Sequence, residues 1–249
     1  MKILVSNDDG IFAPGIKALV KALSEAGHEV LVAAPDRQRS AAGHSMTIGG
    51  LIPVREEHVP GAAKAYAIGG TPADCVKLGL KKLCPEAEMV IAGINHGYNV
   101  GSDVLCSGTV GAAMEGALCG RPAMAVSLAH LREDTYDKAA QTALEALAIL
   151  EKCPLPAYSV LNVNFPPTDE ALGLKVTPLK LMRYKDDYEE VIEEDGTKAY
   201  SLIGGLFCDM PDEDDDYSWL NKGYATLTVL GYDMIEKEAT MKLRAVLGE

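Results

Sequence analysis

Two adjacent carboxylates near the start of the chain are the residues best suited to carry chemistry. Asp8 and Asp9 follow the apolar residues 3–5, which are typical of a buried parallel strand, and Gly10 comes next. Side chains that are neighbours on a strand point to opposite faces, so the two can serve one site only if the chain turns at once, as Gly10 permits. Like charges held together repel each other, and a bound cation would relieve that repulsion. The pair therefore indicates a cation site at a strand end.

Two later loops supply further oxygen donors. Residues 35–45 contain Ser40 and residues 93–101 contain Asn95, and each loop follows a predicted strand. Because ligands bind at the carboxyl ends of the strands in open α/β sheets, the three loops can face one crevice. Carboxylate, hydroxyl and amide oxygens suit Mg²⁺, Mn²⁺ or Ca²⁺ better than zinc or copper. The expected metal ligands are Asp8, Asp9, Ser40 and Asn95.

A turn before a predicted helix offers an anion site. Ser107, Gly108 and Thr109 precede a helix whose free N–H groups and dipole favour negative charge, and Gly108 lets a phosphate approach the backbone. A cation beside this turn could polarise a phosphoryl oxygen and activate water, which is the chemistry of phosphomonoester hydrolysis. Asp8 and Asp9 are then expected to be catalytic as well as metal-binding, and either one could orient or deprotonate the water.

Each of these motifs also has a simpler structural interpretation. Residues 7–10 could form only a turn, residues 107–109 only a helix N-cap, and Asn95 and Asn99 only left-handed turn positions. The acidic residues 209–216 are expected to form a solvated loop, since they lack the ligand spacing of a calcium loop. What favours a site is the presence of oxygen-rich loops after three different strands.

Composition limits the classes of partner. The chain has 249 residues, a hydrophobic fraction of 48% and a formal net charge of −13. Polymeric nucleic acid is disfavoured as a partner, because its phosphates require a basic surface. Six cysteines without zinc-ligand spacing, and the absence of a signal peptide or an apolar membrane span, predict a reduced cytoplasmic protein that does not bind membranes.

The first part of the chain alternates apolar strands with amphipathic helices. This alternation predicts an α/β fold whose mostly parallel sheet is covered on both faces. Strands are expected at residues 3–5, 29–34, 65–68, 89–94, 123–128 and 159–163, and helices at 15–23, from 72 behind an N-cap at Thr71, at 109–119 and at 137–150. The whole chain, residues 1–249, is predicted to be one domain.

The pattern changes after residue 175. Residues 1–175 are expected to form the catalytic core, and residues 176–249 a C-terminal extension. The charged residues 184–200, interrupted by Gly196, predict a projecting hairpin or arm. A strand at 225–230 and a terminal helix at 237–246 are expected to follow.

Five stretches of the sequence resemble the SurE (survival protein E) family of metal-dependent nucleotidases. They are ILVSNDDGIFAPGI, APDRQRSAAGHSMT, GGTPADCVKLGL, AGINHGYNVGSDVLCSGTVGAAMEGAL and NVNFP, and they occur in the family's order between residues 3 and 166. The resemblance implies a Rossmann-like three-layer α/β/α core with a C-terminal extension. It implies cytoplasmic hydrolysis of nucleoside 5′-monophosphates and 3′-monophosphates, and of short-chain polyphosphate by some members.

The resemblance also assigns roles to residues. It implies one divalent cation, Mg²⁺ or Mn²⁺, on the four ligands named above. Phosphate contacts are expected from Ser107, Gly108 and Thr109 and from the loop that holds Asn95 and Asn99. Homodimers formed by exchange of C-terminal elements, or homotetramers formed through the arm, are implied as well.

Two departures and two other functions bear on this interpretation. Cys106 stands where the family often has tyrosine, and residues 181–200 contain few arginines. An aspartyl-phosphate phosphatase is disfavoured, because its two aspartates are usually two positions apart and here they are adjacent. A non-catalytic nucleotide-binding or signalling module is the alternative from a different class.

Overall fold

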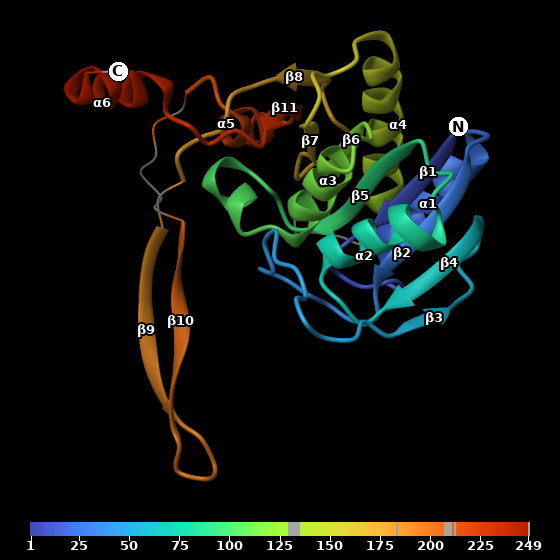
Figure 1. Ribbon diagram of the computed structural model, residues 1–249, viewed down its shortest axis with the longest axis horizontal. Helices are drawn as coiled ribbons and strands as arrows, with labels where there is room; N and C mark the ends of the chain where they lie inside the picture. Colours follow the sequence, from blue (N-terminus) through green and yellow to red (C-terminus); the bar gives the residue numbers. More distant parts are fainter. Residues whose placement is uncertain (129–134, 183, 207–210, 212, 249) are drawn as a thin grey trace.

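A mixed nine-stranded sheet forms the centre of the molecule (Figure 1). The computed structural model describes residues 1–128, 135–182, 184–206, 211 and 213–248. Within them the sheet has the order β3-β4-β2-β1-β5-β6-β7-β11-β8, and β9 and β10 form a separate hairpin. The sheet strands are β1 Lys2–Ser6, β2 Glu29–Pro35, β3 Val54–Glu56, β4 Ala62–Ile68, β5 Met89–His96, β6 Ala123–Leu128, β7 Ser159–Phe165, β8 Leu174–Val176 and β11 Ala225–Gly231.

Helices cover both faces of this sheet, as the alternating sequence pattern predicts. Buried side chains of α1 and α4 pack in one core cluster, and those of α2 and α3 pack in a second cluster on the opposite face. The α/β fold with a mostly parallel sheet is therefore confirmed. The helices are α1 Pro14–Glu25, α2 Pro72–Leu78, α3 Gly108–Leu118, α4 Tyr136–Lys152, α5 Asp216–Asn221 and α6 Lys237–Leu247, with a π-helical turn at Gly79–Leu83 and a 3₁₀ turn at Gly101–Leu105.

The strand order reverses at β1. The chain first adds β2 and β4 on one side of β1, and then returns to add β5, β6 and β7 on the other side. The crevice outside the carboxyl ends of β1 and β5 is thus a topological switch point, where ligands bind in such sheets. Asp8 comes just after β1, and Asn95 is the second-last residue of β5. The topology therefore brings these two positions to that crevice.

Strand β5 continues two residues further than the sequence predicts, because its pairing with β6 resumes after an irregularity. The register shifts between Ala92 and Asn95. Gly93, within this stretch, has a φ of 140°, and a Cβ atom there would lie 2.3 Å from the carbonyl oxygen of Val126. Bulges of this kind change the direction of nearby side chains. Asn95 is therefore a strand residue beside a bulge rather than a loop residue.

The C-terminal part contributes both to the sheet and to a projecting arm. Strand β11 pairs antiparallel with β7, and β8 pairs parallel with β11, so the sheet continues across residue 175. The division into a catalytic core and an extension at that residue stays a prediction. The arm is the antiparallel hairpin β9 Tyr184–Ile192 and β10 Lys198–Leu206, longer than the predicted residues 184–200 and extended away from the sheet (Figure 1). The sequence pattern did not predict β3, β8 or α5.

The acidic residues 209–216 lie partly outside the described residues, and the expectation of a solvated loop is wrong for the last two. Asp215 is 3% exposed and pairs with the Lys180 ammonium, and Asp216 is fully buried. Asp216 accepts hydrogen bonds from the backbone N–H groups of Gly101 (2.7 Å) and Lys180 (3.0 Å). A carboxylate is retained in the interior where such partners satisfy it. The extension is thereby joined to the turn that precedes α3.

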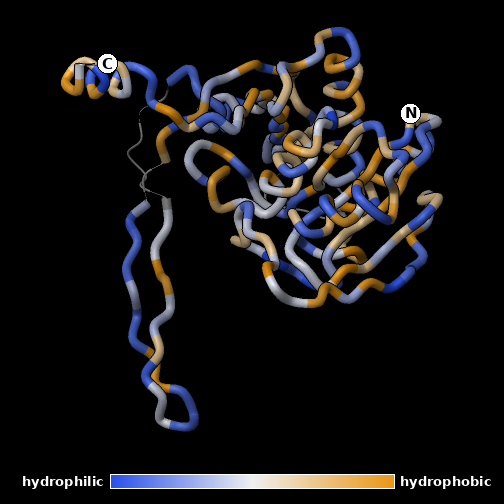
Figure 2. Tube along the Cα trace, viewed as in Figure 1, coloured by the Kyte–Doolittle hydropathy of each residue, from blue (hydrophilic) through white to orange (hydrophobic). Residues whose placement is uncertain are grey.

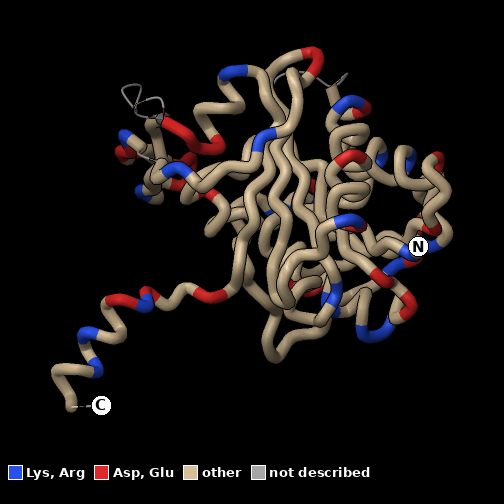
Figure 3. Tube along the Cα trace, turned by 90° about the horizontal axis from the view of Figure 1, so that it is seen from above, with Lys and Arg blue, Asp and Glu red and all other residues tan. Residues whose placement is uncertain are grey.

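Charged residues of both signs are spread over the molecule (Figure 3). Lys and Arg positions are interspersed with Asp and Glu in the view of Figure 3. Over the described residues, none of the helices has the length and apolar character needed to cross a bilayer. Cys75, Cys84, Cys106, Cys119 and Cys153 are free thiols, and Cys208 lies outside the described residues.

We expect Gly15→Ala to destabilise the fold. A Cβ atom at this position in α1 would lie 2.0 Å from the carbonyl oxygen of Ile94 in β5, so the helix must move away from the sheet. Overpacking of this kind costs about 1–3 kcal/mol, which outweighs the better helix propensity of alanine. Gly231→Ala is the matched control, because no atom lies within 4 Å of its Cβ position. Urea unfolding that gives both variants the same free energy would contradict this packing.

Candidate active site

The chain turns directly after β1 through hydrogen bonds made by one asparagine. The Nδ2 of Asn7 donates to the carbonyl of Gly10 (2.9 Å), and the N–H of Gly10 donates to the Asn7 Oδ1 (3.2 Å). Gly10 has a φ of 102°, which glycine adopts readily. The turn interpretation is thus correct for Asn7, and it leaves the side chains of Asp8 and Asp9 to other partners.

Asp8 is bound by the start of α3. Its Oδ1 accepts a hydrogen bond from the Thr109 hydroxyl (2.7 Å), and the Thr109 backbone N–H also favours the charged form of this carboxylate and lowers its pKa. Gly108 lies so close that a Cβ atom there would be 2.8 Å from the Asp8 Cβ. Burial raises the pKa of Asp8, against the lowering effect of Thr109, and the charge of Asp9 raises it further. The helix N-terminus therefore stabilises this carboxylate only in part.

Asp9 is held from the opposite side, by the end of β5. Its Oδ2 accepts a hydrogen bond from the backbone N–H of His96 (3.1 Å). Burial raises the pKa of Asp9, although the His96 N–H and ring favour its charged form. The His96 Nδ1 in turn lies 2.9 Å from the Tyr136 hydroxyl of α4. The sequence suggested for His96 only a surface or hydrogen-bonding role and not a place at the site, and its position directly after Asn95 was the available signal.

Ser40 lies in a loop that is tied to the backbone of Asp8. The N–H of Arg39 donates to the Asp8 carbonyl (2.7 Å), so the residue before Ser40 is fixed beside the acidic pair. The Ser40 side chain is exposed, and its Oγ accepts a hydrogen bond from Gln38 (2.9 Å). The loop is thus held at this end by backbone contacts, while the hydroxyl stays accessible.

Asn95 directly precedes His96, whose N–H binds Asp9. Its Nδ2 donates to the Gly97 carbonyl (2.8 Å), which orients the amide and leaves the oxygen as its ligating atom. In the described part of the chain, no three His, Cys, Asp or Glu side chains gather as a metal-binding group. A cation here would therefore need Ser40 and Asn95 in addition to the two carboxylates. Such an all-oxygen set fits Mg²⁺ or Mn²⁺.

The turn before α3 has an internal role as well as the expected one. The Oγ of Ser107 accepts a hydrogen bond from the N–H of Val110 (3.1 Å), so the N-cap interpretation is correct for its side chain. Thr109 directs its hydroxyl to Asp8. Contacts of Ser107, Gly108 and Thr109 with a phosphate stay predictions. Of the three, Gly108 has no side chain that could keep a phosphate away from its backbone N–H.

Asn99 is buried in a network of asparagines. Its Nδ2 donates to the Ser127 Oγ (2.7 Å), and its N–H donates to the Asn164 Oδ1 (2.9 Å). The Asn99 carbonyl accepts from the side chains of Asn162 (2.8 Å) and Asn164 (3.0 Å). These contacts fix the loop after β5, and a phosphate contact from Asn99 stays a prediction. Two asparagines two positions apart in an otherwise apolar strand were the sequence signal for this network.

Comparison with known proteins places the chain among relatives of the same length. The family model described as "Survival protein SurE" matches residues 3–186. A protein of Kosmotoga olearia named 5′-nucleotidase SurE is 42% identical over 250 residues, covering 99% of this chain and 98% of its own. One of Gloeobacter violaceus with the same name is 45% identical, covering 94% and 91%. The crystal structure of the SurE protein from Aquifex aeolicus matches with a TM-score of 0.83 and 33% identity over 99% of both chains.

The raised pKa of Asp8 predicts how stability depends on pH when no metal is present. Below the ordinary value of 3.8 the carboxyl is protonated in both states, and above it the folded state binds more protons than the unfolded chain. Stability should therefore fall as pH rises through the raised pKa. Urea unfolding in EDTA from about pH 4 to 7 should show this fall for the wild type relative to Asp8→Asn, which keeps the Thr109 contact. Parallel pH profiles for the two proteins would contradict it.

Proposed function

This chain belongs to the SurE family, and from this membership we propose that it hydrolyses nucleoside 5′-monophosphates to a nucleoside and inorganic phosphate. The observation that carries the proposal is the contact of Asp8 with the N-terminus of α3, beside an Asp9 held by the end of β5, at the switch point of the sheet. Two carboxylates suited to a cation and a helix N-terminus suited to a phosphate there lie side by side. The full-length relatives named 5′-nucleotidase support the same activity.

In the proposed site, the four oxygen ligands Asp8, Asp9, Ser40 and Asn95 hold one Mg²⁺ or Mn²⁺. When bound there, a cation would supply Lewis acidity at the phosphoryl group and would lower the pKa of water. The backbone N–H groups at the start of α3, beginning with Gly108, bind the phosphate oxygens. The nucleoside hydroxyl is the leaving group.

The two carboxylates are proposed to act differently. Asp8 is 4% exposed and bound by Thr109, so it is suited to a fixed ligand. Asp9 is less buried and accepts from the His96 backbone, which leaves its second oxygen for the attacking water. We therefore assign to Asp9 the orientation of that water and the acceptance of its proton.

The range of substrates is a finer part of the proposal. Hydrolysis of 3′-monophosphates and of short-chain polyphosphate would use the same cation and phosphate contacts, as the family resemblance implies.

The five free thiols in the described part of the chain support the proposed cytoplasmic location.

A homodimer or homotetramer is the proposed assembly. Helix α6 buries none of its residues in the single chain, and Leu243, Val246 and Leu247 are exposed on it. Apolar residues also recur along the arm, where Tyr188 and Leu202 are exposed (Figure 2). Exposed apolar surface of this extent is typical of an interaction site.

We expect Asp9→Asn to abolish phosphate release from AMP while the fold persists. The amide cannot accept the proton of water and binds a divalent cation more weakly than a carboxylate does. The loss of activity should exceed the ~10²-fold effect typical of a residue that contacts a metal ligand but not the metal itself. Phosphate release and circular dichroism measured side by side check it, with the exposed Glu56→Gln as control. Activity near the wild-type level in Asp9→Asn would contradict the assignment.

A substrate and metal panel tests the function itself. Phosphate release is measured from AMP, GMP, 3′-AMP and tripolyphosphate with Mg²⁺, Mn²⁺, Ca²⁺ or excess EDTA. We expect release from AMP and GMP with Mg²⁺ or Mn²⁺ and none in EDTA, because the two carboxylates then lack their counter-charge. Full activity in EDTA would exclude the metal mechanism. Trapping of a phospho-aspartate would favour the covalent phosphatase, and nucleotide binding without phosphate release would favour the non-catalytic module.

A further inference from the structure

One face of α3 touches both Asp8 and the loop that carries Ser40. We call residues 39–47 the Ser40 loop. Gly108, Gly111 and Glu115 are spaced i, i+3 and i+7 and so share this face of the helix. A Cβ atom at Gly108 would lie 2.8 Å from Asp8, and one at Gly111 would lie 2.5 Å from the carbonyl oxygen of Gly43. The helix backbone therefore packs directly on Asp8 and on the loop.

Glu115 extends this contact with a buried carboxylate. Its side chain is 4% exposed, and its Oε2 lies 2.8 Å from the His44 Nε2 in the Ser40 loop. Its Oε1 lies 2.9 Å from the Lys77 ammonium of α2. A buried carboxylate that loses such partners destabilises the fold. The contact between Glu115 and His44 is therefore expected to persist. Neither His44 nor Glu115 has a role in the proposed chemistry.

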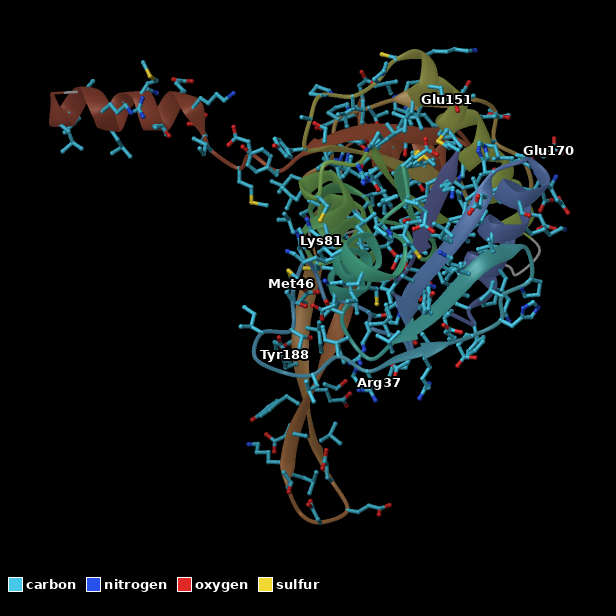
Figure 4. All side chains as sticks on the ribbon, turned by 45° about the vertical axis from the view of Figure 1, so that its right-hand side comes forward. Arg37, Met46, Lys81, Glu151, Glu170 and Tyr188 are labelled. Atoms are coloured by element: carbon cyan, nitrogen blue, oxygen red, sulfur yellow. The ribbon has the colours of Figure 1, made fainter. Side chains whose placement is uncertain are left out.

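Hydrogen bonds also attach the Ser40 loop at its start, in its middle and at its end. At the start, the Arg39 N–H donates to the Asp8 carbonyl, as described above. At the end, Thr47 donates to Asp74 through its N–H (3.0 Å) and its hydroxyl (2.6 Å). Between them Met46 lies next to α2 (Figure 4), with its Sδ 3.6 Å from the Lys77 Nζ. In the middle of the loop, the Gly43 N–H donates to the Cys106 carbonyl (2.9 Å) and the Thr71 hydroxyl donates to the Ser45 carbonyl (2.7 Å). The His44–Glu115 pair adds a contact between two side chains to these bonds.

We propose that His44, held by Glu115, is a positioning residue that keeps the Ser40 hydroxyl within reach of the cation. This inference rests on the proposed function, because Ser40 is a ligand only in that proposal. Ser40 is exposed, and its own side chain is bonded only to Gln38, a neighbour in the same loop. Its place relative to Asp8 therefore depends on how the loop is held. Helix α3 holds both, so it sets the spacing between two ligands that are 32 positions apart in sequence.

Calorimetric titration of the metal-free protein with Mn²⁺ alone tests the proposal. His44→Ala should weaken Mn²⁺ binding by about 10- to 100-fold, the usual effect of losing an outer partner of a metal site. His44→Gln should restore most of the affinity, since its amide can donate to Glu115. Lys77→Met is the matched control: it removes the other partner of the same carboxylate, and its thioether can still pack on Met46. Its Mn²⁺ affinity should equal that of the wild type.

Activity on AMP separates positioning from a general loss of structure. For His44→Ala the Mn²⁺ concentration that gives half-maximal rate should rise, while kcat at saturating Mn²⁺ stays near the wild-type value. Wild-type Mn²⁺ affinity in His44→Ala, equal weakening in Lys77→Met, no rescue by His44→Gln, or a wild type that binds no Mn²⁺ would each overturn the inference. A wild type that binds Mn²⁺ but releases no phosphate would instead overturn the proposed function, and the affinities of the variants would still decide the role of His44.

Discussion

Burial of two adjacent carboxylates at the end of one strand is the constraint around which the rest of the site is built. Asp8 and Asp9 both have raised pKa values, because burial disfavours their charged forms. Separate elements compensate for this in part. The Asn7 turn separates the two side chains, the N-terminus of α3 binds one, and the end of β5 binds the other. A divalent cation would supply the positive charge that these neutral donors lack.

Helix α3 depends on small residues because it must approach several parts of the molecule at once. Gly108 lies on Asp8, Gly111 on the Ser40 loop, and Gly116 on β5, where a Cβ atom would be 2.7 Å from Val90. Close packing of this kind leaves little room for the helix to shift. The same helix provides the N-terminus that the proposed function assigns to phosphate. One rigid element thus fixes the distances between the acidic pair, the Ser40 loop and the anion site.

The C-terminal extension is connected to the same region. Asp216 of α5 binds the backbone of Gly101, in the turn that leads from β5 to α3, and the Asn162 and Asn164 side chains of β7 bind the loop just before it. Gly101 is packed so tightly that a Cβ atom there would lie 2.1 Å from the Lys180 carbonyl oxygen. The segments around the arm therefore reach the connection between β5 and α3, although the arm itself projects away from the sheet.

The sequence by itself determined the features that depend on neighbouring residues. The alternation of strands and helices, the cap of α2 by Thr71 and Asp74, and the oxygen donors after three strands follow from periodicity and local hydrogen bonds. Only the tertiary structure decided the rest, because the partners are distant in sequence. The bulge beside Asn95 arises from the pairing of β5 with β6. His44 contacts a carboxylate 71 positions away, and the buried Asp216 accepts a hydrogen bond from a backbone N–H 115 positions away. A pattern of residue types carries no information about such pairs until the fold brings them together.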